Sequence, residues 1–198
     1  MSIKVITVSR EFGSGGRTIG RLVADKLGWS FYDKEIVNAV AQKSGFAEKF
    51  IEENGEYANV NSSLLFNLSV GAGAENGVLS LYDEIFNAQS QIIRDAAEKG
   101  NCVIVGRCAD FILSDRDDCL NVFIYSDTES RKKRIIEVYG ENNKPIEKRI
   151  RDKDKRRKVY YKSFTGNKWG EMKNYHLAIN SGRISLEKCA DMIVEAVK

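Results

Sequence analysis

The segment that most constrains the fold is Ile3–Gly20, IKVITVSREFGSGGRTIG. It begins with an apolar, β-branched run, turns through the glycine-rich loop GSGG at residues 13–16, and continues with apolar residues at the spacing of one helix face. Glycines let such a loop direct several backbone N–H groups toward one point, and the N-terminus of the following helix adds a partial positive charge. The order of strand, glycine loop and helix therefore predicts a phosphate-binding loop.

This loop departs from the usual phosphate-binding motif, G-x-x-x-x-G-K-[ST]. If Arg17 takes the lysine place and Thr18 the hydroxyl place, the first glycine of the motif falls on Glu11. In a second register Gly16 falls on the lysine and Arg17 follows it. Neither register leaves a lysine in the loop, and an ordinary glycine-rich turn stays open as the alternative to phosphate binding.

Apolar runs alternate with helical patterns along the whole chain. We expect strands at residues 3–8, 29–32, 101–106, 120–125 and 175–180. This alternation predicts an α/β fold with a five-stranded parallel sheet covered by helices on both faces. Ligands of such sheets bind at the carboxyl ends of the strands, where Asp33 follows the second strand and Arg107 the third. Asp33 also suits the N-cap of the next helix, so both roles stay open for it.

A strongly basic helix is expected between the fourth and fifth strands, at residues 147–158, without the apolar stripe of a core helix. One interpretation is a lid whose arginine forks hold bound phosphates. The alternative is a solvated helix that pairs its own charges at i and i+4. We expect a single domain over residues 1–198, with an acceptor-side insertion at 45–80 and the basic lid at 141–173.

The composition is that of an ordinary globular chain. Of 198 residues, 42% are hydrophobic and 30% charged, and the net charge of +3 does not argue for a nucleic-acid binder. Because no apolar run approaches the length of a membrane span, we expect a cytoplasmic protein without a membrane partner. The four cysteines show no C-x-x-C spacing, so free, buried thiols are expected. The single histidine, His176, is expected to be structural.

Five stretches of the chain carry a resemblance to a known family. They are SREFGSGG-R at 9–17, FYD at 31–33, VIVGRCAD at 103–110, DKRRKVYYKSFTGNKWG at 154–170 and NYHLAINSGRIS at 174–185. Over nearly its whole length the chain resembles the cytidylate kinase-like family of P-loop nucleoside monophosphate kinase folds. The resemblance implies phosphoryl transfer from ATP, with Mg²⁺, to a small nucleotide acceptor, in the first place a nucleoside monophosphate such as CMP.

The resemblance also assigns site residues by position. The residues implied to bind the donor and its phosphates are Gly13, Ser14, Gly15, Gly16, Arg17, Thr18, Arg151 and Arg156. Thr18 is the implied Mg²⁺ ligand. The acceptor is implied to contact Asp33, Arg107 and Asp152. The groups expected to act in catalysis are Arg17, Asp33, Arg107 and Arg157.

Two departures from the family pattern leave a second hypothesis open. The loop lysine is missing, so Arg17, Arg10 or a lid arginine would have to supply its charge. The third strand also ends without the aspartate that many P-loop enzymes use for Mg²⁺, so that Asp110 or Asp33 would have to replace it. The alternative is therefore a nucleotide-binding protein without turnover, acting as a sensor or partner module. A third interpretation, an RNA-binding protein, relies on the basic helix alone.

Overall fold

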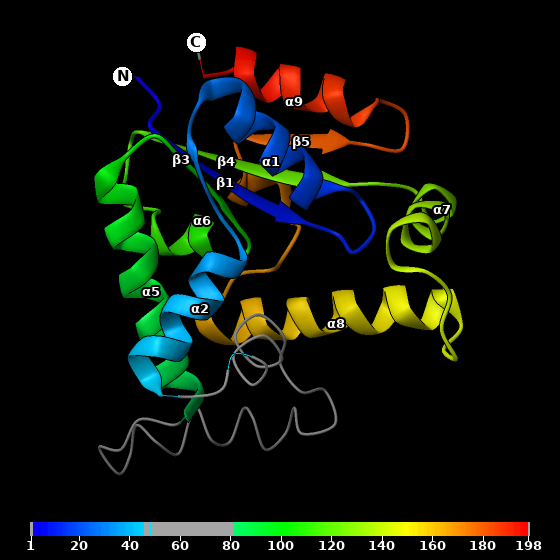
Figure 1. The fold of residues 1–198 in the computed structure, drawn as a ribbon, viewed down its shortest axis with the longest axis horizontal. Coiled ribbons are helices and arrows are strands. Elements are labelled where there is room, and N and C mark those ends of the chain that lie inside the picture. Colours follow the sequence, from blue (N-terminus) through cyan, green and yellow to red (C-terminus); the bar gives the residue numbers. More distant parts are fainter. Residues whose placement is uncertain (1, 46–47, 49–80, 198) are drawn as a thin grey trace.

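The computed structural model describes residues 2–45, 48 and 81–197. The expected insertion at 45–80 lies outside the described residues except at positions 45 and 48. In chain order the elements are β1 (Val5–Arg10), α1 (Gly16–Leu27), β2 (Ser30–Tyr32), α2 (Lys34–Ser44), α5 (Leu81–Lys99), β3 (Cys102–Val105), α6 (Ala109–Ile112), β4 (Cys119–Tyr125), α7 (Thr128–Tyr139), α8 (Ile146–Thr165), a short 3₁₀ helix (Met172–Asn174), β5 (Leu177–Asn180) and α9 (Leu186–Glu195) (Figure 1).

The strands form one parallel sheet in the order β2-β3-β1-β4-β5. β1 lies at the centre, with Val5 opposite Cys102 on β3 and Cys119 on β4. All six residues of β1 are buried, as its apolar sequence predicts for a central parallel strand. The expected five-stranded α/β fold is confirmed, and each strand lies within two residues of its expected position.

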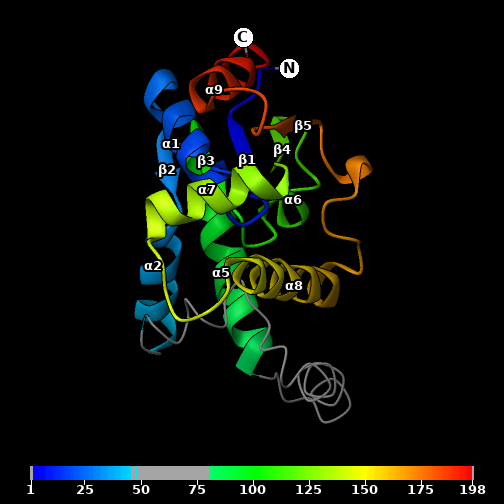
Figure 2. The same cartoon turned by 90° about the vertical axis from the view of Figure 1, so that its right-hand side faces the viewer.

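Helices cover both faces of the sheet (Figures 1 and 2). On one face, α1 and α9 pack against side chains such as Ile6 and Val8 of β1. On the other, α2, α5, α6 and part of α8 pack against the strands. Successive side chains of a strand point to opposite faces, so Thr7 and Ser9 point to this second face. There Thr7 Oγ1 donates a hydrogen bond of 2.6 Å to Asn121 Oδ1.

Helix α8 differs from its expected form. The helix continues past the expected end at residue 158 to Thr165, because its aromatic second half packs on α5, with Phe86 stacked on Phe164 at 4.3 Å between ring centroids. It also has a buried face, which the sequence pattern did not predict. The side chains of that face, from the N-terminal end, are those of Ile150, Asp154, Arg157, Tyr160 and Tyr161. The first half of this face is mainly polar, so the sequence shows no apolar stripe there.

Two smaller expectations concern the cysteines and membrane association. All four cysteines are free and buried, as expected. Across the described residues, no helix combines the length and the apolar character that a membrane span requires. His176 accepts a 2.9 Å hydrogen bond at Nδ1 from the backbone N–H of Asn121, an interaction that ties β4 to the segment entering β5.

Candidate active site

The glycine loop between β1 and α1 has a backbone that only glycine accommodates at two positions. Gly13 and Gly15 both have a φ of +82°. A Cβ on Gly13 would lie 2.8 Å from Ile135 of α7, and a Cβ on Gly15 would lie 2.8 Å from Leu186 of α9. Between them Ser14 is buried, with its hydroxyl 3.1 Å from the carbonyl oxygen of Ile124. The loop is therefore held closely between α7 and α9, with the N-terminus of α1 behind it.

This loop forms one wall of a cleft of about 330 Å³. Arg17, Asp33, Arg107 and Arg157, which come from four separate elements or their ends, all line it. Among the described residues, seven cationic side chains and two carboxylates line the cleft: Arg10, Arg17, Lys34, Arg107, Arg134, Lys153 and Arg157 against Glu11 and Asp33. An excess of cations beside a glycine loop and a helix N-terminus is suited to a ligand with several phosphate groups.

Arg17 and Asp33 form an ion pair across the cleft, with Arg17 Nε 2.5 Å from Asp33 Oδ2. The Arg17 side chain is half exposed, whereas that of Asp33 is 13% exposed. Asp33 occupies the N-cap position of α2, but its side chain makes no capping hydrogen bond. Its carboxylate instead lines the cleft, and the ion pair with Arg17 joins the start of α1 to the start of α2.

Arg107 lies at the end of β3 in an unusual backbone segment. Gly106, Arg107 and Cys108 have φ angles of +70°, +61° and +55°, a conformation that non-glycine residues rarely adopt. The Arg107 side chain is 5% exposed and donates from Nη1 to Oε1 of the buried Gln89 at 3.2 Å. Gln89 in turn donates to the hydroxyl of Tyr160 at 3.1 Å. Arg107 Nε has no hydrogen-bond partner among the described residues, so this buried cation retains a donor for a ligand.

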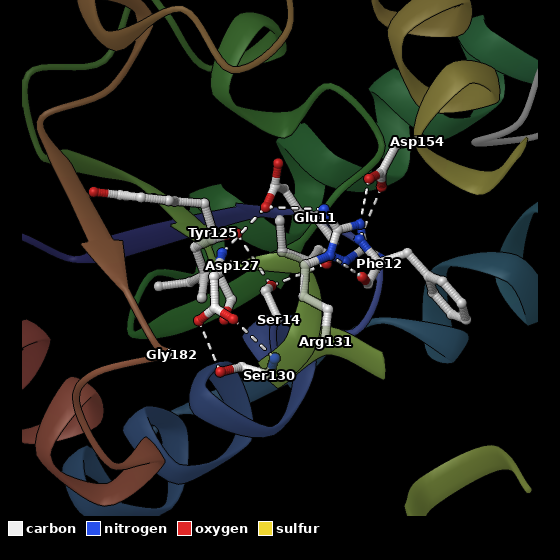
Figure 3. A network of polar contacts seen from close by, with 12 residues as sticks. Glu11, Phe12, Ser14, Tyr125, Asp127, Ser130, Arg131, Asp154 and Gly182 are labelled. Carbon is white, nitrogen blue, oxygen red and sulfur yellow. Dashed lines mark hydrogen bonds and ion pairs between the residues drawn. The ribbon is translucent and has the colours of Figure 1, made fainter. Parts of the chain in front are cut away.

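A second polar network connects the loop to α7 and α8 (Figure 3). Asp154 of α8 accepts a 2.9 Å hydrogen bond from the backbone N–H of Phe12 and forms an ion pair with Arg131 of α7. Arg131 Nε donates to the carbonyl oxygen of Phe12 at 2.7 Å, and its Nη1 lies 3.2 Å from Glu11 Oε2. Glu11 also accepts a hydrogen bond from the N–H of Ser126. These contacts hold the front of the loop in place from both helices.

A further acid lies behind the cleft, at the start of α6. Asp110 is buried, Tyr161 donates to its Oδ2 at 2.6 Å, and the Ser9 hydroxyl lies 3.5 Å from its Oδ1. Burial raises the pKa of the Asp110 carboxyl above its usual value, although its hydrogen bonds act in the opposite direction. Asp110 does not line the cleft, whereas Asp33 does. Of the two acids expected to support Mg²⁺, only Asp33 is therefore at the cleft.

Comparison with known proteins agrees with this geometry. Residues 5–183 match the cytidylate kinase-like family. The chain belongs to that family. It is 29% identical to the cytidylate kinase of Archaeoglobus fulgidus over 98% of this chain and 94% of that protein.

Solved structures with a similar fold are also known. An uncharacterized protein from Eubacterium ventriosum superposes with a TM-score of 0.73 at 28% identity, over 98% of both chains. The shikimate kinase from Acinetobacter baumannii, solved with shikimate, has a TM-score of 0.55 at 16% identity, over 98% of this chain and 93% of that one. This second likeness concerns the fold alone. It confirms the expected P-loop kinase-like fold, with its five-stranded parallel sheet.

The lid expected at residues 141–173 contains α8, and only part of this helix faces the cleft. Lys153 and Arg157 line the cleft, and Arg157 Nη1 donates to the carbonyl oxygen of Arg10 at 3.0 Å. Arg151 is exposed, and Asp152 and Arg156 are half-buried; none of these three lines the cleft. Helical periodicity explains this, since Arg157 shares the buried face of α8 with Ile150, Asp154 and Tyr161, whereas residues 151, 152 and 156 are turned away from that face. Their expected roles in phosphate and acceptor binding stay predictions.

The Mg²⁺ ion implied by the resemblance can be compared with the oxygen atoms at the cleft. Thr18 Oγ1, the implied ligand, accepts a 2.8 Å hydrogen bond from Arg134 Nη2 of α7. The part of the chain that the structure describes contains no group of three or more His, Cys, Asp or Glu side chains placed to hold a metal. Mg²⁺ in phosphoryl-transfer sites commonly takes one or two protein oxygens together with substrate phosphates. Thr18 and Asp33 supply oxygens of the kind that Mg²⁺ takes, and each of them now contacts an arginine, Arg134 and Arg17 respectively.

Several residues of this site were not anticipated from the sequence: Glu11, Arg131, Arg134, Lys153 and Asp154. Arg131 and Arg134 are three residues apart on α7 and both contact the glycine loop or the start of α1. Their spacing on one face of an expected helix was the available signal. It carried no information about what the face would meet, because α7 and the loop are more than 100 residues apart in the sequence.

Proposed function

We propose that this chain is a kinase that transfers the γ-phosphoryl group of ATP to a nucleoside monophosphate such as CMP. The observation that carries the proposal is the shared cleft, where the glycine loop meets arginines from β1, α1, the end of β3, α7 and α8. Phosphoryl transfer requires little covalent chemistry from the protein. It depends mainly on positioning and on neutralising the charge of the phosphates.

Each part of the cleft has a role in this proposal. The N–H groups of the loop and the N-terminus of α1 hold the donor phosphates, and Arg157 approaches them from α8. Arg107 binds the phosphate of the acceptor with its remaining donor, while the Arg17–Asp33 pair positions the acceptor nucleotide. An oxygen of the acceptor phosphate then bonds to the γ-phosphorus as the bond to ADP breaks. Thr18 and Asp33 would hold a Mg²⁺ ion that arrives with the nucleotide, and the ion would supply further charge neutralisation.

A second candidate function is nucleotide binding without turnover. The missing loop lysine favours it, because in other phosphate-binding loops that residue contacts the β- and γ-phosphates of ATP, between which the bond breaks. The excess of cations at the cleft supports the kinase instead, since a binding module has less need to surround a phosphate from several elements. The two functions differ in whether ADP accumulates when an acceptor is added.

The test is a kinase assay with ATP and Mg²⁺ across a panel of nucleoside monophosphates, with ATP-induced changes in melting temperature measured in parallel. Arg17→Ala and Arg107→Ala are compared with Arg94→Ala, an exposed arginine on α5 that pairs with Asp115 outside the cleft. We expect turnover with one acceptor, lost in the first two variants and retained in Arg94→Ala. Stabilisation by ATP without turnover on any acceptor would support the binding module. If the protein shows no turnover and no stabilisation by ATP, both functions are contradicted.

A further inference from the structure

We propose that Arg10 supplies the positive charge that the loop lysine provides in other phosphate-binding loops. The inference rests on the proposed function, because it concerns how the same cleft binds ATP. It concerns a residue at the end of β1, before the loop, and not one on the helix that follows.

Compared with the usual phosphate-binding motif, this segment has a glycine and a cationic residue in each other's positions. In the register that places Gly16 at the lysine of G-x-x-x-x-G-K-[ST], the first glycine of the motif falls on Arg10. The residue type expected at one end of the motif is thus found at the other. The chain has a cation where the motif has a glycine, and a glycine where the motif has a cation.

The structure gives this exchange a steric reason. A Cβ built on Gly16 would lie 2.4 Å from Arg10 Cβ and 2.9 Å from Arg10 Cγ. Both distances are shorter than atoms tolerate, and the first involves the base of the arginine side chain, which cannot swing away. The arginine stem therefore occupies the space that the first carbons of a lysine at position 16 would need. A side chain at position 10 and one at position 16 exclude each other.

The Arg10 side chain is also placed to meet phosphates. The residue is 8% exposed, and it lines the cleft together with Gly13, Gly15 and Gly16. Its carbonyl oxygen is held by Arg157 Nη1 at 3.0 Å, which fixes the end of β1 against the lid helix. A packed stem and a fixed backbone pre-organise the guanidinium for binding, as a planar fork suited to two phosphate oxygens.

Arg17, the other arginine near the loop, pairs with Asp33. Arg17 is half exposed, and its Nε lies 2.5 Å from Asp33 Oδ2, at the start of α2. This ion pair places Arg17 beside Asp33 on one side of the cleft. Because the Arg10 stem packs on Gly16 of the loop, we assign the lysine's role to Arg10 and the acceptor side to Arg17.

The test uses substitutions that separate charge from packing. Arg10→Met keeps an unbranched stem over Gly16 but removes the charge. Arg10→Gly clears the space, because an alanine would keep the Cβ that lies 2.4 Å from a Cβ at position 16. Arg10→Gly combined with Gly16→Lys returns a cation from the position used in the motif. Gly16→Lys alone meets the arginine stem, and Arg94→Ala is the control. ATP and adenosine affinities are measured by calorimetry, and kcat/KM in the kinase assay. Melting temperatures identify any variant that fails to fold.

We expect Arg10→Met to lower kcat/KM by about 100-fold or more, the usual effect of removing one preorganised donor from a developing charge. Its ATP affinity is expected to fall about 10-fold with adenosine binding unchanged, since one charge-assisted contact to phosphate is lost. The double variant is expected to regain at least about 10-fold in ATP affinity over Arg10→Gly, whereas Gly16→Lys alone binds less well than the wild type.

The inference is overturned if Arg10→Met binds ATP as the wild type does, or if the double variant is no better than Arg10→Gly. Its failure can be distinguished from that of the proposed function. A wild type that binds ATP but turns over no acceptor contradicts the kinase, while the affinities still decide the role of Arg10. A wild type that turns over normally with Arg10→Met as active as Arg94→Ala contradicts only the role of Arg10.

Discussion

The two faces of the central sheet differ in what they bury. On the face covered by α1 and α9, the core cluster consists of aliphatic and aromatic side chains with one cysteine. On the other face, polar side chains lie among the apolar ones, and they form connected pairs: Thr7 with Asn121, Tyr161 with Asp110, and Arg107 with Gln89. The strands are the same, so the difference comes from alternate residues of each strand and from the helices above them.

This comparison separates stability from function within one domain. Buried polar groups stabilise a fold little even when they are fully hydrogen-bonded, and a buried charge with an unused donor lowers its stability. The apolar face therefore contributes more stability for each buried residue. The polar face places Arg107 and the polar half of α8 at the cleft, a placement that apolar packing alone does not achieve.

The largest effect is expected from Arg107→Met, which breaks the polar face at the cleft. We expect kcat/KM to fall about 1,000-fold, equivalent to about 4 kcal/mol, because a preorganised cation is lost from the acceptor side. The unfolding free energy is expected to stay within about 1 kcal/mol of the wild type or to rise, since the change removes a buried charge and keeps its volume. Kinase assays and urea unfolding give the two quantities. A large loss of stability with normal turnover would reverse the contrast between the faces.

The opposite result is expected from Ile193→Ala on the apolar face. Ile193 of α9 is fully buried among aliphatic side chains, so its truncation leaves a cavity. We expect the unfolding free energy to fall by about 3 kcal/mol, with kcat/KM at temperatures below the transition unchanged. Ile193→Val, as the matched control, should lose about 1 kcal/mol. Urea unfolding measures the free energy of unfolding of both variants. If Ile193→Ala loses less stability than Ile193→Val, this face is loosely packed.

A smaller effect is expected from Asp110→Asn, and it depends on pH. Because burial raises the pKa of Asp110 above its value of 3.8 in the unfolded chain, the folded protein retains this proton over a range where the unfolded chain has lost it. The contribution of Asp110 to stability therefore falls as the pH rises from about 4. We expect the stability of Asp110→Asn relative to the wild type to increase from pH 4 to pH 7 in urea unfolding. Asp117→Asn, at an exposed position, is the control. An equal change of stability with pH in both variants would contradict the raised pKa of Asp110.

The smallest signal is expected from the cysteines. Burial raises the pKa of Cys102 to about 11 and that of Cys119 to about 12, and both are on the polar face. Thiol reagents attack the thiolate, so we expect no labelling of these two residues in the folded protein at pH 8 and complete labelling in urea. Mass spectrometry after timed labelling checks this. Rapid labelling of Cys102 or Cys119 without urea would show that the polar face opens far more readily than the apolar one.

Much of the architecture was predictable because its signals are local. Buried parallel strands are continuous apolar runs, and the glycine loop marks a turn that other residues cannot make, so the five strands and the fold class follow from the sequence. Asp33 and Arg107 were recognised as cleft residues because each follows a strand, and the carboxyl ends of parallel strands share one edge. Helix α8 was only partly predictable, since its buried face begins with charged residues.

The order of the elements, the position of the glycine loop and the strand ends at which the cleft forms all follow from local sequence patterns. Which charged side chains meet at the cleft depends on the packing of distant segments. The contact between Phe12 and Asp154 joins residues 142 positions apart, and no local pattern marks Asp154 as different from its charged neighbours. Local periodicity decides whether a segment becomes a strand or a helix, but the partner of a charged residue depends on which distant surface folding brings against it.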